Sequence, residues 1–421
     1  ALQKAIIEEY VPFLSDVLLK ADLLQGELKA VVRKGKEHFV CDYRLAQRLE
    51  AVRDKNKNQA QMEALKSLRH NFDLDSVHNL SGFDRRLVCV PKFCPRECPG
   101  KAGCRYQRHL DISRKEDIFL QICNHNYLLA DAMHRANGYR PLLADYRALV
   151  VDEAHNAEDE ARRAFSTSLS SETIKRLIRT LTSDSSRYNP LIRAEREQVA
   201  EEAKTLLSTM LSKTRNAGVA FAIAAEEYCL SVKDLLYFDA SKRSHGYEYV
   251  DLWINDDIRR SSVLQSLASF GATMREKAEK LVSSCQELVG YLEEIEGAAD
   301  VQREIAAVAM DLKDIIAASE VILDIAPEGF AYSATLCRKK DRAAEVLEAL
   351  LVNVGSALNE TLYARTRSTV FTSATLSVDG SFRSFENAMG LNEGDGAHSR
   401  LLELDSSYDF DNNMVVYVVD D

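Results

Sequence analysis

A chain of 421 residues is too long for one ordinary hydrophobic core, so we expect two or three domains. Its 46% hydrophobic and 28% charged residues are typical of globular proteins, and no apolar run reaches the roughly 20 residues of a membrane span. The net charge of −11 argues against a general affinity for nucleic acid but leaves room for a local basic surface.

The first residues, ALQKAIIEEY, combine an apolar run with Lys4, Glu8 and Glu9 and have no cleavage-like segment, which is unlike a signal peptide. We therefore expect a cytoplasmic protein without a membrane partner. Helical periodicity extends over residues 1–24, and the chain starts within it without a Met. We expect from this that the chain is a fragment of a longer protein.

Further elements follow in chain order. Apolar and β-branched runs predict strands at residues 28–32, 118–123, 148–151 (buried), 246–255, 369–372 and 413–421. Helices are predicted near residue 105 and over residues 126–135 and 347–362. Residues 166–325 are rich in Leu, Ala, Glu and Lys with amphipathic spacing, which predicts a mostly helical insert. An α/β domain that is interrupted twice explains this order most simply.

An acidic motif, Asp152-Glu153-Ala154-His155, follows the apolar strand at 148–151 and opens a helix. The carboxyl end of such a strand faces the crevice where α/β sheets bind nucleotides. There Asp152 is suited to holding Mg²⁺ and Glu153 to activating water. The alternative is a helix start whose acids favour the helix dipole, but the preceding strand favours the nucleotide site.

A phosphate-binding loop of the form G-x-x-x-x-G-K-[ST] does not occur in these 421 residues. The nearest match, residues 98–102, has Ala102 where Ser or Thr is required. If the parent protein binds ATP, its phosphate loop lies before residue 1.

The string SATL occurs at residues 333–336 and again at 373–376. The second copy follows a better strand and precedes a polar turn, so its hydroxyls can hydrogen-bond the acidic motif. We therefore interpret residues 372–376 as functional and residues 333–336 as a chance match beside charged residues.

Three cysteines lie within eleven positions, CPRECPGKAGC, on a loop rich in Pro and Gly. Cys41 is the expected fourth ligand beside Cys94, Cys98 and Cys104, with Cys89 as a competitor whose neighbours indicate a buried apolar thiol. Four thiolates suit zinc or an iron–sulfur cluster. Structural zinc sites usually have paired C-x2-4-C knuckles on both sides of the insert. Here one side offers the single Cys41, which favours a cluster over zinc.

The cysteine neighbourhood is basic. Its cations are Arg85, Arg86, Lys92, Arg96, Lys101, Arg105, Arg108, Arg114 and Lys115. They form a candidate track for phosphates, or they offset the charge of a thiolate-ligated centre.

Taken together, Cys41, Cys94, Cys98 and Cys104, the segment ICNHNYLLAD (122–131), VVDEAH (150–155) and TSATLSVDGSF (372–382) resemble the DinG/XPD-type iron–sulfur helicases of superfamily 2. The segment LNETLYARTRSTVFTSATL (358–376) particularly resembles the bacterial DinG branch. The resemblance covers nearly the whole chain, and it is weak over residues 166–325.

This resemblance implies an incomplete α/β, RecA-like motor domain into which an iron–sulfur domain and a helical arch domain are inserted. The expected order is: RecA-like 1–40, Fe–S 41–112, RecA-like 113–165, arch 166–325, RecA-like 326–405 and the start of a second motor domain at 406–421. The implied activity is ATP-driven 5′→3′ unwinding of forked or hybrid duplexes by a monomer on single-stranded DNA, in repair or replication.

The implied cofactors are a [4Fe-4S] cluster and, in the full-length protein, Mg²⁺ and ATP. By position, Asp152 would hold Mg²⁺ and Glu153 would activate water, while His155, Ser373 and Thr375 would couple hydrolysis to movement. Gln3, Arg96, Lys101 and Arg105 are candidate DNA contacts. Because Walker A and most of the second motor domain lie outside the chain, we expect no ATP hydrolysis from these 421 residues alone.

Two alternatives stay open from the sequence. One is a nucleic-acid-binding Fe–S or zinc protein that acts as a clamp without a motor. The other is a structural zinc protein in which DEAH is incidental.

Overall fold

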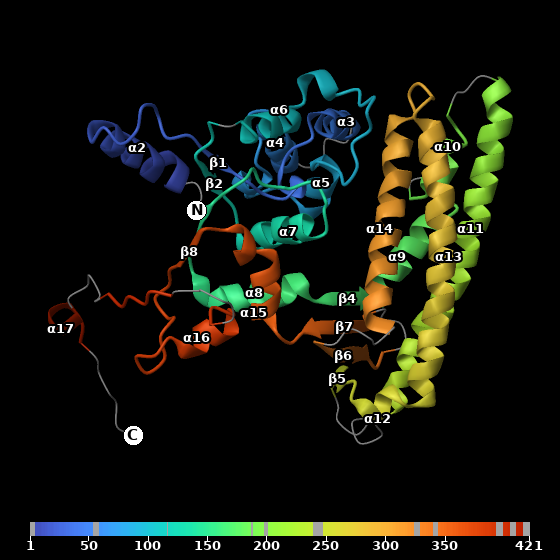
Figure 1. The fold of residues 1–421 in the computed structure, drawn as a ribbon. Helices are drawn as coiled ribbons and strands as arrows, with labels where there is room; N and C mark the ends of the chain where they lie inside the picture. The colour runs from blue at the N-terminus through green and yellow to red at the C-terminus, as the bar shows by residue number, and fades with distance from the viewer. Residues whose placement is uncertain are drawn as a thin grey trace. The chain divides into compact units, whose positions relative to one another are not determined.

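The computed structural model shows a mixed α/β protein in which helices predominate (Figure 1). It describes residues 5–53, 59–115, 117–186, 188–197, 201–238, 247–323, 329–339, 344–392, 399–404 and 410–415. Among these residues, no helix is both long and apolar enough to cross a membrane. The chain divides into two compact units, Ala1–Tyr146 with Asp159–Val352 and Arg147–Glu158 with Asn353–Asp421.

The first unit begins with a π-helical turn, Ile6–Tyr10, that continues into α2 (Val11–Lys20). The helix predicted over residues 1–24 is thus confirmed for its middle part. β1 (Ala30–Val32) pairs in parallel with β2 (Leu120–Ile122), so the strands predicted at 28–32 and 118–123 exist in shorter form. Parallel strands need a long crossover, and here it contains the cysteine segment.

Between β1 and β2 lie α3 (Asp42–Arg53), α4 (Gln59–Ser67), α5 (Gly82–Val88) and α6 (Arg105–Ser113). They enclose a small core of Val40, Leu45, Leu49, Leu65, Leu68, Leu74 and Val88. After β2, α7 (His125–Ala136) begins at Asn124, whose side chain accepts a hydrogen bond from the Tyr127 amide and caps the helix. The helices predicted near residue 105 and at 126–135 are confirmed.

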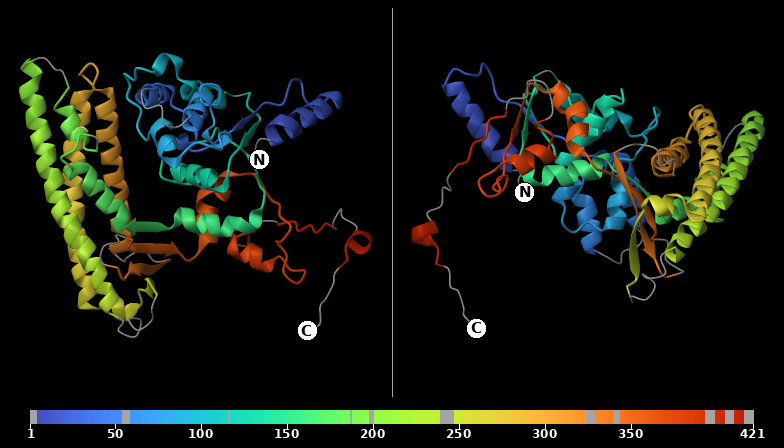
Figure 2. Two further views of the ribbon diagram at one scale, coloured as in Figure 1. Left: turned by 180° about the vertical axis from the view of Figure 1, so that it is seen from behind. Right: turned by 60° about the horizontal axis from the view of Figure 1, so that its bottom comes forward.

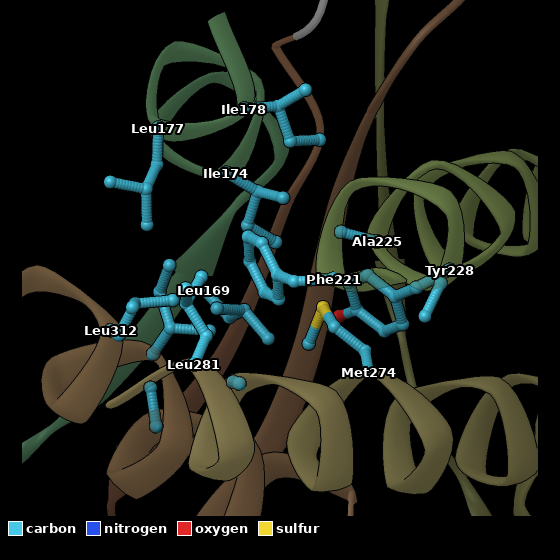
Figure 3. Packing of buried hydrophobic residues seen from close by; sticks show 14 of the residues in the cluster. Leu169, Ile174, Leu177, Ile178, Phe221, Ala225, Tyr228, Met274, Leu281 and Leu312 are labelled. Carbon is cyan, nitrogen blue, oxygen red and sulfur yellow. The ribbon is translucent and has the colours of Figure 1, made fainter. Parts of the chain in front are cut away.

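The insert expected at 166–325 is mostly helical, as predicted. It contains α9 (Ser171–Thr182), α10 (Pro190–Ala194), α11 (Glu201–Asp234), α12 (Asp256–Arg259), α13 (Ser262–Leu292) and α14 (Ala299–Leu323). α11, α13 and α14 run side by side (Figures 1 and 2). Their facing stripes bury Phe221, Tyr228, Met274 and Leu281 (Figure 3). Each fully buried Phe, Met or Leu side chain contributes about 1.5–3 kcal/mol.

A four-stranded antiparallel sheet belongs to the same unit. Its order is β4 (Thr167–Ser170), β7 (Val346–Leu351), β6 (Phe330–Cys337) and β5 (Tyr249–Trp253). The inward residues Leu169, Leu252, Ala334 and Leu347 join the helical core. The predicted strand at 246–255 is therefore confirmed over five residues, and SATL 333–336 lies inside β6.

One helix prediction is partly wrong. Residues 347–362 divide into the end of β7 and α15 (Val354–Thr361). Tertiary packing explains the difference, because alternate residues Leu347 and Ala349 are buried against the helical core while Glu348 is half-buried on the other face. A run of Leu and Ala fits both the helical and the strand period, and packing against the core determines whether a helix or a strand forms.

The second unit contains β3 (Ala148–Val151) and β8 (Ser368–Phe371), which pair in parallel. α8 (Ala157–Phe165) follows β3 and crosses into the first unit, while α15, α16 (Arg383–Ala388) and α17 (Phe410–Asn413) complete the described helices. The predicted strands at 148–151 and 369–372 are confirmed, but the expectation of a buried strand is wrong for Val150, which is 67% exposed. The strand predicted at 413–421 lies mostly outside the described residues.

Candidate functional site

The carboxyl ends of β3 and β8 meet at one edge of the second unit's sheet. Val151 lies opposite Phe371 in the parallel register, so the next residues, Asp152 and Thr372, leave the sheet together. The amide of Thr372 donates to the Val151 carbonyl at 2.9 Å, and the amide of Ala154 donates to the Thr372 carbonyl at 3.0 Å. Backbone pairing therefore holds the acidic motif against the start of the TSATL segment.

Asp152 is positioned by a side-chain contact across this edge. The Thr372 hydroxyl donates to Asp152 Oδ1 at 2.9 Å. A hydrogen bond to a carboxylate is stronger than one between neutral groups, so it orients the carboxylate firmly. Sequence reasoning assigned Asp152 but not Thr372 as an individual site residue; the missed signal is that Thr372 directly follows the strand.

Glu153 adopts a left-handed backbone conformation with φ of +49° and ψ of +45°. A residue with a Cβ pays a free-energy cost in this region, and such outliers concentrate at functional sites. The conformation bends the chain between β3 and the short helical turn at Ala154–Asn156, and the Glu153 side chain is 62% exposed. Its carboxylate is therefore accessible to water.

His155 connects the two halves of the site. Its Nδ1 lies 2.8 Å from Ser373 Oγ and 3.3 Å from Glu153 Oε2. When the imidazole is neutral with its proton on Nε2, the Ser373 hydroxyl donates to Nδ1. When the ring is charged, Nδ1–H donates instead toward Ser373 and Glu153.

Thr375 takes part through its backbone. Its amide donates to Ser373 Oγ at 3.4 Å and so helps to fix the position of this hydroxyl group. The chain of contacts therefore runs from the Thr375 amide through Ser373 to His155 and on to Glu153. The structure brings together all five predicted residues of this site: Asp152, Glu153, His155, Ser373 and Thr375.

These groups could bind a hydrated divalent cation and act on water. Asp and Glu carboxylates are the hard oxygen ligands that Mg²⁺ accepts, commonly with several of its waters retained. The Ser373–His155–Glu153 contacts connect the two strand ends. Both strand ends belong to the same compact unit.

The four predicted metal ligands lie around α3 and α6 in the first unit. Cys41 precedes α3, and Cys104 caps α6, where its Sγ accepts from the Gln107 amide at 3.4 Å. Burial raises the pKa of the Cys41 and Cys94 thiols, and Cys98 lies near enough to raise both further through its charge.

A preformed metal site is not found among the described residues, in which no three His, Cys, Asp or Glu side chains are placed to hold an ion. The cluster therefore stays a prediction from the number and spacing of the cysteines. Cys89 packs against the small core but is only half-buried, and its thiol donates to the Arg86 carbonyl at 3.5 Å. The expectation of a buried apolar thiol there is therefore confirmed only in part.

The predicted DNA contacts have different surroundings. Arg96 is exposed and lies 3.6 Å from Glu293, and Lys101 donates to the Arg96 carbonyl at 3.1 Å. Arg105 donates to Asp42 Oδ1 and to the Leu68 carbonyl, both at 2.8 Å, which gives it a structural role at the start of α6. Gln3 lies outside the described residues.

Comparison with known proteins gives one distant match. No protein-family model matches the chain. The probable ATP-dependent helicase YpvA of Bacillus subtilis (strain 168) is 22% identical over an alignment of 438 positions that covers 98% of this chain. The chain spans 58% of the length of that relative.

Proposed function

We propose that this chain is part of an ATP-dependent DNA helicase of the DinG/XPD type. The observation that carries the proposal is the joined strand edge, where Thr372 orients Asp152 and Ser373 contacts His155. A motor needs such a connection, because nucleotide hydrolysis at the acidic motif has to change the position of a second segment. The similarity to YpvA along 98% of the chain supports the same function.

The geometry of the site supports the following residue roles. Asp152 binds Mg²⁺ of Mg-ATP, and Glu153 accepts a proton from the attacking water. His155 and Ser373 transmit the state of Glu153 to the TSATL segment, with the Thr375 amide fixing the Ser373 hydroxyl. In the intact motor this drives 5′→3′ movement on single-stranded DNA.

The 421-residue chain contains no G-x-x-x-x-G-K-[ST] loop, so we expect no DNA-stimulated ATP hydrolysis from it alone. In the full-length protein, Glu153→Gln should lower ATP turnover by a factor on the order of 100 while retaining nucleotide binding. The matched control is Glu360→Gln on α15, an exposed acid of the same unit.

Two outcomes would contradict these expectations. If the 421-residue chain alone hydrolyses ATP in response to DNA, it does not need a phosphate-binding loop outside these residues. If full-length Glu153→Gln protein turns over ATP at the rate of the unsubstituted protein, Glu153 does not take part in ATP hydrolysis.

We further propose that Cys41, Cys94, Cys98 and Cys104 hold a [4Fe-4S] cluster, for which the support is their number, their thiolate chemistry and their spacing. Protein purified without oxygen should be brown and contain iron and sulfide, and Cys98→Ser should reduce both. Cys229→Ser, at a buried cysteine of α11, is the control. A colourless protein with stoichiometric zinc supports the zinc alternative instead.

A further inference from the structure

The turn that follows α7 holds an exposed aromatic side chain and a cation in a defined position. Gly138 has φ of +69°, and its amide donates to the Arg135 carbonyl at 3.3 Å. The Tyr139 amide donates to the His134 carbonyl at 2.8 Å, which completes a Schellman motif. His134 Nδ1 lies 3.1 Å from the Arg140 carbonyl, so the ring also fixes the next residue.

Tyr139 is presented to solvent by this turn. It is 64% exposed, and the edge of its ring packs against His134 with centroids 5.7 Å apart. A large aromatic side chain held rigidly in water loses little conformational entropy on binding a flat partner. The turn is therefore suited to stacking.

Two arginines lie near this turn. Arg114, at the end of α6, and Arg140 are both exposed and form no ion pair with any residue that the structure describes. Arg33 connects the two segments, because its guanidinium donates to the Ser113 hydroxyl, next to Arg114, and to the Leu142 carbonyl at 2.6 Å, two residues after Arg140. In agreement with this placement, partial burial and the positive charges of Arg140 and Arg33 lower the pKa of Arg114. Asp111 offsets this positive charge only in part.

Arg33 adds charge from below the surface. It is 3% exposed and donates to the Ser113 hydroxyl, to the Tyr127 hydroxyl at 3.1 Å and to the Leu142 carbonyl at 2.6 Å, all of which are neutral groups. No carboxylate in the described part of the chain forms an ion pair with it. Three guanidinium groups thus lie near one another, and Asp111 offsets their charge only in part. This leaves a local positive region that attracts an anion, although the net charge of the protein is −11.

We propose that Arg114, Tyr139 and Arg140, here called the basic–aromatic surface, bind single-stranded nucleic acid. The two guanidinium groups contact backbone phosphates, and a base stacks on the Tyr139 ring. An acidic peptide would satisfy the charges but would not use the aromatic face. The proposal rests on the proposed nucleic-acid function and adds a location to it.

The charge test uses the 421-residue chain and a fluorescein-labelled oligothymidylate, with binding measured by anisotropy between about 50 and 200 mM salt. Each phosphate contact on a single strand contributes about 0.7 to the slope of log K against log salt. Arg114→Gln with Arg140→Gln should therefore reduce the slope by about 1.4. The matched control is Lys280→Gln, an exposed cation that is already paired with Glu276 at 2.6 Å.

The stacking test separates the aromatic side chain from the charges. Tyr139→Leu should weaken binding on the order of 10-fold and leave the salt slope unchanged. Tyr139→Phe keeps the ring and should bind like the unsubstituted chain, which controls for damage to the turn. Phe13→Leu, at a 69% exposed aromatic residue of α2, is the control for a general loss of exposed aromatic surface.

The outcomes distinguish this surface from the broader function. One outcome is that the unsubstituted chain binds the oligonucleotide while the Arg114→Gln/Arg140→Gln and Tyr139→Leu variants keep its affinity and salt slope. In that case the proposal for the basic–aromatic surface is wrong and the proposed function stands. If the unsubstituted chain does not bind the oligonucleotide, both are overturned. Displacement by polyglutamate as effective as by unlabelled oligothymidylate also overturns the proposal, because charge alone would then explain binding.

Discussion

Thr372 shows how the site depends on single positions at the strand end. The sequence pattern indicated Ser373 and Thr375 as the hydroxyl residues of the coupling segment. In the structure Ser373 contacts His155, Thr375 contributes its amide, and Thr372 donates to Asp152. Which hydroxyl reaches the acid is set by the parallel register of β3 and β8, and sequence alone does not specify register.

Asp75 provides a prediction at the same scale. It accepts hydrogen bonds from Lys34 at 3.1 Å and from Arg85, and it lies 3.0 Å from His38 Nδ1. Burial by itself raises the pKa of Asp75, but the hydrogen bonds from Arg85 and Lys34 outweigh it and lower the pKa to about 2. The ionised carboxylate therefore stabilises the fold above its ordinary pKa of 3.8.

Asp75→Asn should lower the free energy of unfolding at pH 7 by about 1 kcal/mol, because solvent screens this half-exposed cluster. Since the folded-state pKa is depressed, the difference from the unsubstituted protein should shrink as the pH falls from about 4 toward 2. Urea unfolding at several pH values measures this. Asp16→Asn, which removes an exposed ion pair with Lys20, is the control. If the difference in free energy of unfolding between Asp75→Asn and the unsubstituted protein stays constant down to pH 2, the carboxylate of Asp75 does not stabilise the fold in this way.

Among the elements, α13 illustrates how packing modifies helix propensity. Its glycines, Gly271 and Gly290, lie in the same helix but in opposite environments. A Cβ at Gly271 would collide with the buried Leu323 side chain and lie 3.6 Å from the Tyr228 ring, whereas a Cβ at Gly290 would have no atom within 4 Å. Gly271 therefore allows α13 and α14 to approach each other closely.

Gly271→Ala should lower the free energy of unfolding of the helical segment by about 1–3 kcal/mol through overpacking. Gly290→Ala should raise it by roughly 0.5–1 kcal/mol, because alanine restricts the unfolded chain and favours the helix. Chemical denaturation should therefore show that the free energy of unfolding changes in opposite directions in the two variants. Equal stabilisation by both would show that Leu323 yields without cost.

For the whole molecule, the division into two compact units predicts two unfolding events. Trp253 is the single tryptophan of the sequence and lies in β5 of the first unit, so its fluorescence reports that unit. Far-ultraviolet circular dichroism reports the helices of both units. The two probes together can therefore separate the transitions.

Gly355→Ala tests this separation. Its Cβ would lie 2.6 Å from the Cα of Gly390, a backbone contact within the second unit that cannot yield by side-chain rotation. We expect a loss of about 1–3 kcal/mol in the second unit, seen by circular dichroism, with an unchanged Trp253 transition. Gly271→Ala should shift the Trp253 transition, and a Gly355→Ala variant that shifts both probes together contradicts independent units.

The sequence by itself determined the helical character of residues 166–325, most strand positions and the residues of the acidic motif. These features depend on local periodicity and on which residue types follow a strand, and both are readable without coordinates. The prediction of a helix over 347–362 was partly wrong. A run such as LEALL fits both the helical and the strand period, and packing against the core determines which one forms.

Only the tertiary structure decided which groups meet. Thr372 contacts Asp152 only because β3 pairs with β8, and the segments of Arg114 and Arg140 are connected through the hydrogen bonds of Arg33. Neither pairing can be read from the local sequence. The cysteines show the reverse case: their spacing predicts a cluster, while the described side chains form no metal site. Spacing specifies which ligands are available, and three-dimensional packing determines whether they converge.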